Sequence, residues 1–318
     1  MYAVAKQFHL GRVAYWSFHY PKGVIQRTFR RDPIRRSFDE KARQQMEATA
    51  YSLTPITLAS GPDTPEIHFL TGAGFWYQTC FCAYSMMQQA DRYLRPVIYD
   101  DGSLEQVHQA AIQRLFPDVR ILQRREIEAR LNQWLPLQKF PWLRSRRLAY
   151  PQLRKLTDIH VGSQGWKLVL DSDMLFFQPP TLLLDWLESP QHPCHMVDVE
   201  NAYGYSEQLM TALAGSPIPD LVNVGVCGLQ SEAIDWEEME FWCKTLIEQE
   251  GSHYYQEQAL TAMLMARYPR KVAPAAQYQV LPSRREVMRP TATLHHYVAD
   301  SKPWYFRYGW RHAVGMPV

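Results

Sequence analysis

The sequence lacks the features that mark disulfide-bonded, zinc-binding and membrane-spanning proteins. Its 318 residues include five cysteines, none of them in a Cys-x-x-Cys pair, so neither a disulfide framework nor a zinc site of that type is predicted. No apolar run approaches the roughly 20 residues of a membrane span. No basic segment followed by an apolar one marks a secretory signal near the first residue. We therefore expect a protein of the reducing cytoplasm.

A strong net charge is also absent. The formal net charge is +2 at pH 7, which is too small to predict a nucleic-acid partner. Two segments are locally basic: residues 22–43 contain eight Lys or Arg against three acidic residues, and residues 120–155 contain ten against two. Such segments are usually solvated surface, and contact with a phosphorylated ligand, an anionic membrane or nucleic acid is the alternative. Peripheral membrane contact therefore stays open.

The chain is long enough for one large domain with elaborations. Residues 1–60 are polar, basic and aromatic, with one helix expected at Phe38–Tyr51. Neither an internal repeat nor a linker separates the rest. We expect an N-terminal extension, residues 1–60, packed on a single main domain, residues 61–318.

Strands and helices alternate regularly from Glu66. The expected strands are Ile67–Leu70, Pro96–Tyr99 and Val119–Leu122. Helices are expected between them at Trp76–Ala90 and Ser103–Phe116, the second with a Ser-x-x-Gln capping box. Such alternation predicts an α/β fold with a mainly parallel, Rossmann-like sheet flanked by helices.

The second half of the chain alternates less regularly. We expect a basic helical stretch, two strands, two amphipathic helices and an irregular aromatic tail, in this order: Arg144–His160, His195–Val199, Val222–Leu229, Trp236–Glu250, Gln256–Arg267 and the segment from Leu294.

The run Lys167–Phe177 combines a buried strand with two carboxylates at its end. Ligands of open α/β sheets bind outside the carboxyl ends of the strands, where Asp171 and Asp173 are expected to lie. Two carboxylates this close resist simultaneous ionisation unless a cation offsets their repulsion. A hard divalent ion carrying a phosphorylated ligand, Mn²⁺ or Mg²⁺, is one interpretation. The other is that one Asp caps the next element and its neighbour is solvated.

Two later segments offer polar groups. Asn223 and Gly225 fall on or beside a strand, where an amide can bind hydroxyl groups and a glycine lets a ligand approach the backbone. A β-bulge explains the same residues. Glu257 and Gln258 open a helix, and Glu257 is equally explained by the attraction of a carboxylate to a helix N-terminus.

The aromatic tail contains two histidines and a lysine. A neutral His can complete a metal site begun by carboxylates, and a Lys can bind phosphate as a point charge. His296 lies six residues before Lys302, and His295 does not have that spacing.

Taken in order, the strand ending in LDSD, the NVG, EQ and HHYVADSKPW segments resemble the GT-A fold glycosyltransferases, and most the family 8 group that includes glycogenin and galactosyltransferases. The resemblance spans residues 66–306. It implies a GT-A (Rossmann-like) mixed sheet and transfer of a hexose, with retention of configuration, from a UDP-sugar donor to a hydroxyl acceptor. It also implies Mn²⁺ or Mg²⁺ held by Asp171, Asp173 and His296, with Lys302 on the diphosphate.

The resemblance carries over further residues. It implies contacts with the nucleotide, diphosphate or sugar for Thr71, Gly72, Asp100, Asp101, Arg147, Asn223 and Gly225. For a retaining reaction Gln258 or Asn223 supports the sugar, whereas an inverting reaction needs Glu257 as base, with Asp198 or Glu200 as substitutes. The chain departs from the family at Ala299, usually Gly, and at Ala259, usually a second acid.

Two other functions fit the same residues. A phosphohydrolase would use Asp171 as nucleophile and Asp173 as general acid. A protein that binds a nucleotide sugar without catalysis would keep the same contacts. The metal-site interpretation makes one structural demand of its own, because the tail must fold back over the end of the strand that precedes Asp171.

Overall fold

The structure is a computed structural model that describes residues 33–317. The first 32 residues of the expected N-terminal extension lie outside the described part. Contacts within the chain divide it into two compact units, Met1–Gln45 and Met46–Val318. The expected boundary at residue 60 falls within the second unit, and the packing of the extension on the main domain stays a prediction.

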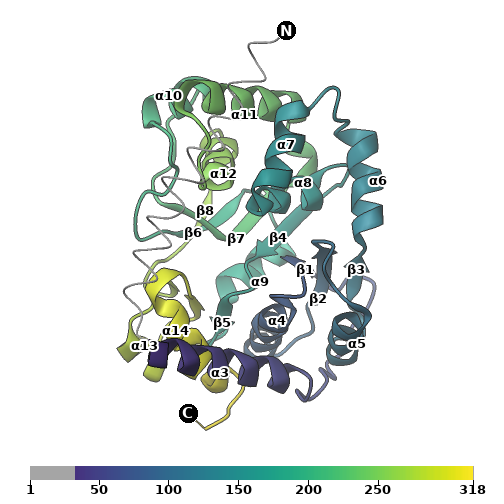
Figure 1. Cartoon of the computed structure of the whole chain (residues 1–318), viewed down its shortest axis with the longest axis vertical. Helices are drawn as coiled ribbons and strands as arrows, with labels where there is room; N and C mark the ends of the chain where they lie inside the picture. The colour runs from purple at the N-terminus through teal and green to yellow at the C-terminus, as the bar shows by residue number, and fades with distance from the viewer. Residues whose placement is uncertain (1–32, 318) are drawn as a thin grey trace. The chain divides into compact units, whose positions relative to one another are not determined.

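Residues 33–317 form two sheets, of which the larger has seven strands in the order β3-β2-β1-β4-β7-β6-β8 (Figure 1). Neighbouring strands from β3 to β4 are parallel, β7 runs antiparallel to both β4 and β6, and β6 and β8 are parallel. The strands are β1 (Glu66–Thr71), β2 (Arg95–Asp100), β3 (Arg120–Leu122), β4 (Trp166–Leu170), β6 (Cys194–Val197), β7 (Val222–Gln230) and β8 (Lys271–Ala273). The predicted mixed, mainly parallel sheet is confirmed.

Alternate residues of each strand face opposite sides of this sheet. Leu168 and Leu170 belong to one buried core, and Val169 between them belongs to the other. Helices α4 (Trp76–Ala90) and α5 (Gln106–Leu115) cover the first core. Figure 1 shows them on one side of the sheet, with α7 (Pro141–Ala149), α8 (Arg154–His160), α11 (Trp236–Glu250) and α12 (Gln256–Ala266) on the other.

The second face is covered by helices that come later in the chain. These are α6 (Arg124–Trp134), α7 (Pro141–Ala149), α8 (Arg154–His160), α10 (Glu207–Ala214), α11 (Trp236–Glu250) and α12 (Gln256–Ala266). Three further helices have the bounds α3 (Pro33–Ala50), α9 (Thr181–Glu188) and α13 (Arg284–Met288).

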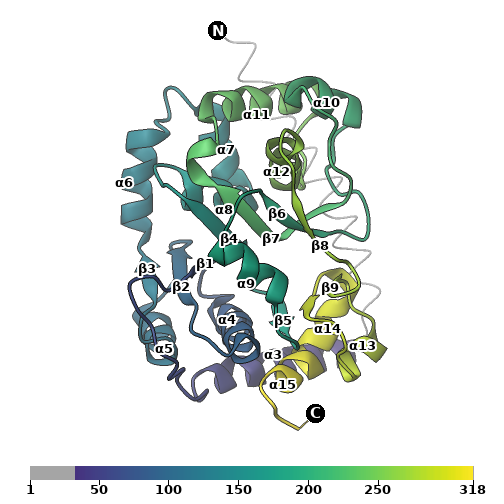
Figure 2. The same cartoon turned by 180° about the vertical axis from the view of Figure 1, so that it is seen from behind.

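A small three-stranded sheet brings the C-terminal segment to the end of β4. Its strands are β5 (Met174–Phe176), β9 (Tyr278–Val280) and β10 (Leu294–His296), in the order β5-β10-β9. Figure 2 shows β5 beside the C-terminal elements β9 and α14 (Lys302–Trp304). The tail, expected to be irregular, therefore begins with a strand and continues through the short helices α14 and α15 (Trp310–Ala313).

Two expectations about helix boundaries were wrong. The capping box of α5 is formed by Glu105 and His108, because the Ser103 hydroxyl instead donates to Asp101 (2.5 Å). The basic stretch expected as one helix is broken into α7 and α8 around Pro151. Proline lacks a backbone donor and disfavours the helical conformation of the residue before it.

All five cysteines are buried and free. Among residues 33–317, no helix is long and apolar enough to cross a membrane.

Candidate functional site

The two aspartates lie in the turn between β4 and β5, at the carboxyl edge of the large sheet. Strand β10 pairs antiparallel with β5 and places His296 opposite Met174. The amide of Tyr297 donates to the carbonyl of Asp173 (2.9 Å). The tail thus folds back over the end of β4, as the metal-site interpretation requires.

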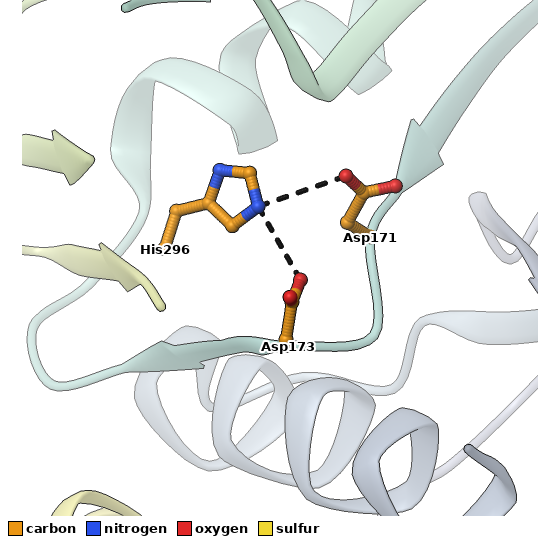
Figure 3. Close-up of side chains that lie close together, drawn as sticks. All are labelled: Asp171, Asp173 and His296. Carbon is orange, nitrogen blue, oxygen red and sulfur yellow. Dashed lines mark ion pairs between the residues drawn. The ribbon is translucent and has the colours of Figure 1, made fainter. Parts of the chain in front are cut away.

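Asp171, Asp173 and His296 point toward one another (Figure 3). Nε2 of His296 lies 3.6 Å from Oδ2 of Asp171 and 3.3 Å from Oδ1 of Asp173. One ligand atom from each residue falls within 4.8 Å of the other two. Carboxylate oxygens suit Mn²⁺ and Mg²⁺, and imidazole is a common ligand of divalent transition metals. The donor set therefore fits a divalent cation.

His296 and its acidic neighbours perturb one another. Burial disfavours the charged imidazole, but the hydrogen bond and charge of Asp173, helped by Asp171, outweigh it and raise the pKa of His296. Burial likewise opposes ionisation of Asp173, and Lys302 and His296 overcome it and lower its pKa. The site is thus arranged to keep Asp173 ionised, as a metal ligand must be.

Lys302 stands at the outer side of the pair of aspartates. Its Nζ lies 2.9 Å from Oδ2 of Asp173, and its side chain is 41% exposed. The negative charge of Asp173 raises the pKa of Lys302 against the opposing effect of burial. The six-residue spacing between His296 and Lys302 therefore places a positive charge beside the two carboxylates and the imidazole.

Lys155 lies on the inner, less exposed side of the two aspartates. It was not singled out from the sequence. Its Nζ lies 2.9 Å from Oδ1 of Asp171 and 3.6 Å from Oε1 of Glu257, and its side chain is 12% exposed. Burial opposes its charge, but Asp171 and Glu257 together raise its pKa. The signal that could have identified it is its position in the basic stretch, on helix α8 directly before β4.

The basic residue chosen from the sequence, Arg147, is engaged elsewhere. It is 2% exposed and donates to Asp158 (2.7 Å) and Glu128 (2.8 Å). Lys155 is the basic side chain of this stretch that contacts Asp171, and the contact of Arg147 with the diphosphate or the sugar stays a prediction. Sequence position alone does not separate Arg147 from Lys155, because both fall in helices of the same basic segment.

Glu257 is buried at the start of α12. Burial raises its pKa to about 7, the nearby Asp171 adds to this effect and Lys155 opposes it. A carboxyl group poised near neutral pH is able to exchange a proton under physiological conditions.

Asn223, Gln258 and Asp198 form a hydrogen-bonded group. Nδ2 of Asn223 and Nε2 of Gln258 each donate to Oδ2 of Asp198 at 3.0 Å. Gln258 also donates to the carbonyl of Val222 (2.8 Å). Both amides are therefore held by one carboxylate, and their predicted contact with a sugar stays a prediction.

Gly225 lies against the imidazole of His296. A Cβ atom there would come within 2.5 Å of Cε1 of His296 and 2.9 Å of Oδ1 of Asn223. Its carbonyl accepts the amide of Asp171 (2.8 Å). The glycine thus makes room for a site residue, and the shift of register between β6 and β7, which leaves residues 224–226 without a partner in β6, agrees with the β-bulge that the sequence left open.

The residues expected at the nucleotide lie at the ends of β1 and β2. Thr71 is buried and accepts from Thr79 (2.9 Å), and a Cβ at Gly72 would collide with the carboxylate of Asp101. Oδ1 of Asp100 accepts two backbone N–H groups of the following turn. A hollow of about 480 Å³ borders Asp100, with Gly102, Gln123, Arg124 and Arg125. Their contact with a nucleotide stays a prediction.

Comparisons with known proteins bear on the fold. No protein-family model matches the sequence, and no curated protein sequence matches it. Among solved structures, the galactosyltransferase LgtC, crystallised with donor and acceptor sugar analogues, is similar with a TM-score of 0.52 and 16% identity over 79% of this chain and 95% of that one. The bifunctional glycosyltransferase WbbM is similar with a TM-score of 0.51 and 9% identity over 82% of this chain and 51% of that one. The chain has the GT-A glycosyltransferase fold.

Proposed function

We propose that this protein is a metal-dependent glycosyltransferase that moves a hexose from a UDP-sugar to a hydroxyl acceptor. The observation that carries the proposal is the meeting of Asp171, Asp173 and His296 with Lys302 at the carboxyl edge of a GT-A sheet. Residues about 125 positions apart converge there, at the place where open α/β sheets bind their ligands.

Mn²⁺ or Mg²⁺ is the proposed cofactor, held by Asp171, Asp173 and His296. When bound, the ion supplies positive charge for the diphosphate of the donor. The side chain of Lys302 is partly exposed beside this position, so it is able to bind a phosphate oxygen as a point charge. Lys155 holds Asp171 in place by the 2.9 Å ion pair. The ion and Lys302 would thus stabilise the negative charge that develops on the departing nucleotide.

Retention of configuration is the proposed stereochemical course. The two amide hydrogens of Gln258 are taken by Asp198 and the Val222 carbonyl, so its carbonyl oxygen is the group it can offer to a sugar. An oxygen without a proton suits the face of a sugar that develops positive charge. Glu257, which shares Lys155 with Asp171, serves the sugar or acceptor side and is not needed as a strong base.

Several parts of the proposal rest on the sequence and the resemblance. The nucleotide is assigned to Thr71, Gly72, Asp100 and Asp101, and the hollow beside Asp100 is of the size that small ligands occupy. A cytoplasmic location is proposed because the five cysteines are buried as free thiols. Peripheral membrane contact through the basic segments remains part of the proposal.

Incubation with a panel of UDP-sugars tests the activity. We expect release of UDP from at least one donor in the presence of Mn²⁺ and cell extract as acceptor source, and loss of release on chelation. Asp173→Ala should reduce the rate to background, and the matched variant Asp63→Ala, at an exposed position before β1, should retain it.

Other outcomes overturn the proposal in distinguishable ways. UDP binding without release from any donor would identify a binding protein. Release of inorganic phosphate from phosphorylated substrates, retained in His296→Gln and lost in Asp171→Ala, would identify a phosphohydrolase.

A further inference from the structure

Asp198, Asn223 and His296 form a continuous hydrogen-bonded chain that ends at the metal position. Nδ2 of Asn223 donates to Oδ2 of Asp198 (3.0 Å), and Oδ1 of Asn223 lies 3.1 Å from Nδ1 of His296. Asn223 and His296 are both buried. Asp198 directly follows β6 and is half-buried, without direct contact to the three proposed ligands among the interactions of residues 33–317.

The orientation of the Asn223 amide follows from partners whose chemistry is unambiguous. The backbone N–H of Gly225 lies 3.0 Å from one end of the amide, which must therefore be the carbonyl oxygen. The opposite end faces the carboxylate of Asp198, which accepts and cannot donate when ionised, so this end must be the NH₂ group. Reversing the amide would oppose donor to donor and acceptor to acceptor.

This orientation selects one tautomer of His296. Since the atom facing Nδ1 is a carbonyl oxygen, Nδ1 must carry the proton. The neutral ring then has its lone pair on Nε2, the atom that faces Asp171 and Asp173. A ring with the proton on Nε2 would have no electron pair for a cation at that position.

Gly225 restricts the ring as well as the amide. A side chain at this position would lie 2.5 Å from Cε1 and 2.6 Å from Nδ1 of His296. The ring is therefore packed against the backbone of β7 while Asn223 binds its Nδ1. Packing fixes where the ring lies, and the hydrogen bond fixes which nitrogen is free.

We infer that Asp198 is a positioning residue of the metal site, which acts through Asn223 to hold His296 in the tautomer that presents Nε2. The same Oδ2 atom accepts from Gln258 (3.0 Å), so one carboxylate orients both amides of the site. The inference rests on the proposed function in taking the site to bind a divalent metal. Glycosyl transfer itself is not required for it.

The first test measures the affinity of the full chain for Mn²⁺ alone, by electron paramagnetic resonance of the free ion. Partners that orient a metal-binding His typically contribute 10- to 100-fold to affinity, so Asp198→Ala should raise the Kd for Mn²⁺ by about 10-fold or more. Asp63→Ala, with the same change of charge at an exposed site, should leave the Kd unchanged. An unchanged Kd in Asp198→Ala would overturn the inference.

A conservative variant separates hydrogen bonding from charge. Asp198→Asn keeps one oxygen that can accept from both amides, so its Kd for Mn²⁺ should stay well below that of Asp198→Ala. If the two variants are equally impaired, the charge of Asp198 acts directly on the metal and the inference is wrong. Urea unfolding of both variants, measured in parallel, identifies any loss that comes from unfolding.

The tautomer is measurable in the unmodified protein. In protein loaded with diamagnetic Mg²⁺, ¹⁵N–¹H correlation spectra should show the proton of His296 on Nδ1, with the signal assigned by its loss in His296→Gln. A proton on Nε2 would overturn the inference whatever the Asp198 variants show. If no donor releases UDP but the Kd values and the tautomer are as expected, the proposed transferase activity is refuted and the role of Asp198 still holds.

Discussion

The two aspartates of the site are each paired with a lysine, and the two pairs differ in their surroundings. Lys155 reaches Asp171 from α8 with 12% of its side chain exposed, and it also contacts the buried Glu257. Lys302 reaches Asp173 from the C-terminal segment with 41% of its side chain exposed. The two lysines therefore differ in their access to water and salt, whereas both aspartates are partly buried, with 26% of the Asp171 and 16% of the Asp173 side chain exposed.

This difference separates a structural charge from a binding charge. A buried lysine between two carboxylates is required by them, because an uncompensated charge in the interior is costly. A partly exposed lysine contributes little to stability, so it is free to exchange a carboxylate for a phosphate oxygen. We expect Lys155 to serve the fold and Lys302 to serve the ligand.

Removing each lysine is the strongest way to break this comparison. Lys155→Met should lower the free energy of unfolding by about 3–5 kcal/mol, since it leaves the buried Glu257 and the partly buried Asp171 without their partner. Lys302→Met should lower it by about 0–1 kcal/mol. Urea unfolding measures both.

A double variant sharpens this result. Lys155→Met combined with Glu257→Gln should be less destabilised than Lys155→Met alone, because one of the stranded carboxylates is gone. Equal destabilisation by the two single lysine variants would show that the inner and outer pairs are not different in kind.

The pH dependence of stability isolates Glu257. Its pKa is raised to about 7, first by burial and then by Asp171, so the folded state binds a proton that the unfolded chain releases near the ordinary glutamate pKa of 4.5. The contribution of this group is complete below pH 4.5 and is lost as the pH rises through 7, at most by about 1.4 kcal/mol per pH unit.

The free energy of unfolding of the wild type, relative to Glu257→Gln, should therefore fall between pH 5 and pH 8. Urea titrations at each pH measure the difference, in which the other titrating groups largely cancel. A difference that rises with pH would show that the charge of Lys155 outweighs the burial of Glu257 and lowers the pKa of Glu257.

The smallest expected effect concerns the loop between His296 and Lys302. Ala299 has a φ of +43° and is exposed, in the left-handed region that favours glycine. Ala299→Gly should raise the free energy of unfolding by about 0.5–1 kcal/mol. The control Ala129→Gly, inside α6, should lower it by about 1 kcal/mol. Destabilisation by both changes would refute strain at Ala299.

The regular first half of the fold could be predicted from the sequence. Strand β1 and helix α4 follow from short apolar runs and their spacing, because local burial patterns decide such elements. The antiparallel insertion of β7 between β4 and β6 could not, since Val222–Gln230 is buried along its length and a continuous apolar strand does not reveal the direction of its neighbours.

The site shows the same division. The structure brings together Asp171, Asp173 and His296, which the sequence singled out by their residue types and spacing. Lys155 was missed, because it lies eight residues after Arg147 in the same basic segment and only the packing of α7 and α8 decides which basic side chain reaches Asp171. The part played by Asp198 depends on hydrogen bonds among three separate elements, and no local pattern predicts them.

The thermal stability of the protein with UDP and Mn²⁺ tests the central claim most directly. At about one hundred times its dissociation constant, UDP should stabilise the fold by about 2.7 kcal/mol, visible as a rise in melting temperature that requires Mn²⁺ and is abolished by Asp173→Ala. A rise of full size in Asp173→Ala, or one that persists in the presence of chelator, would contradict a metal–diphosphate site built from Asp171, Asp173 and His296.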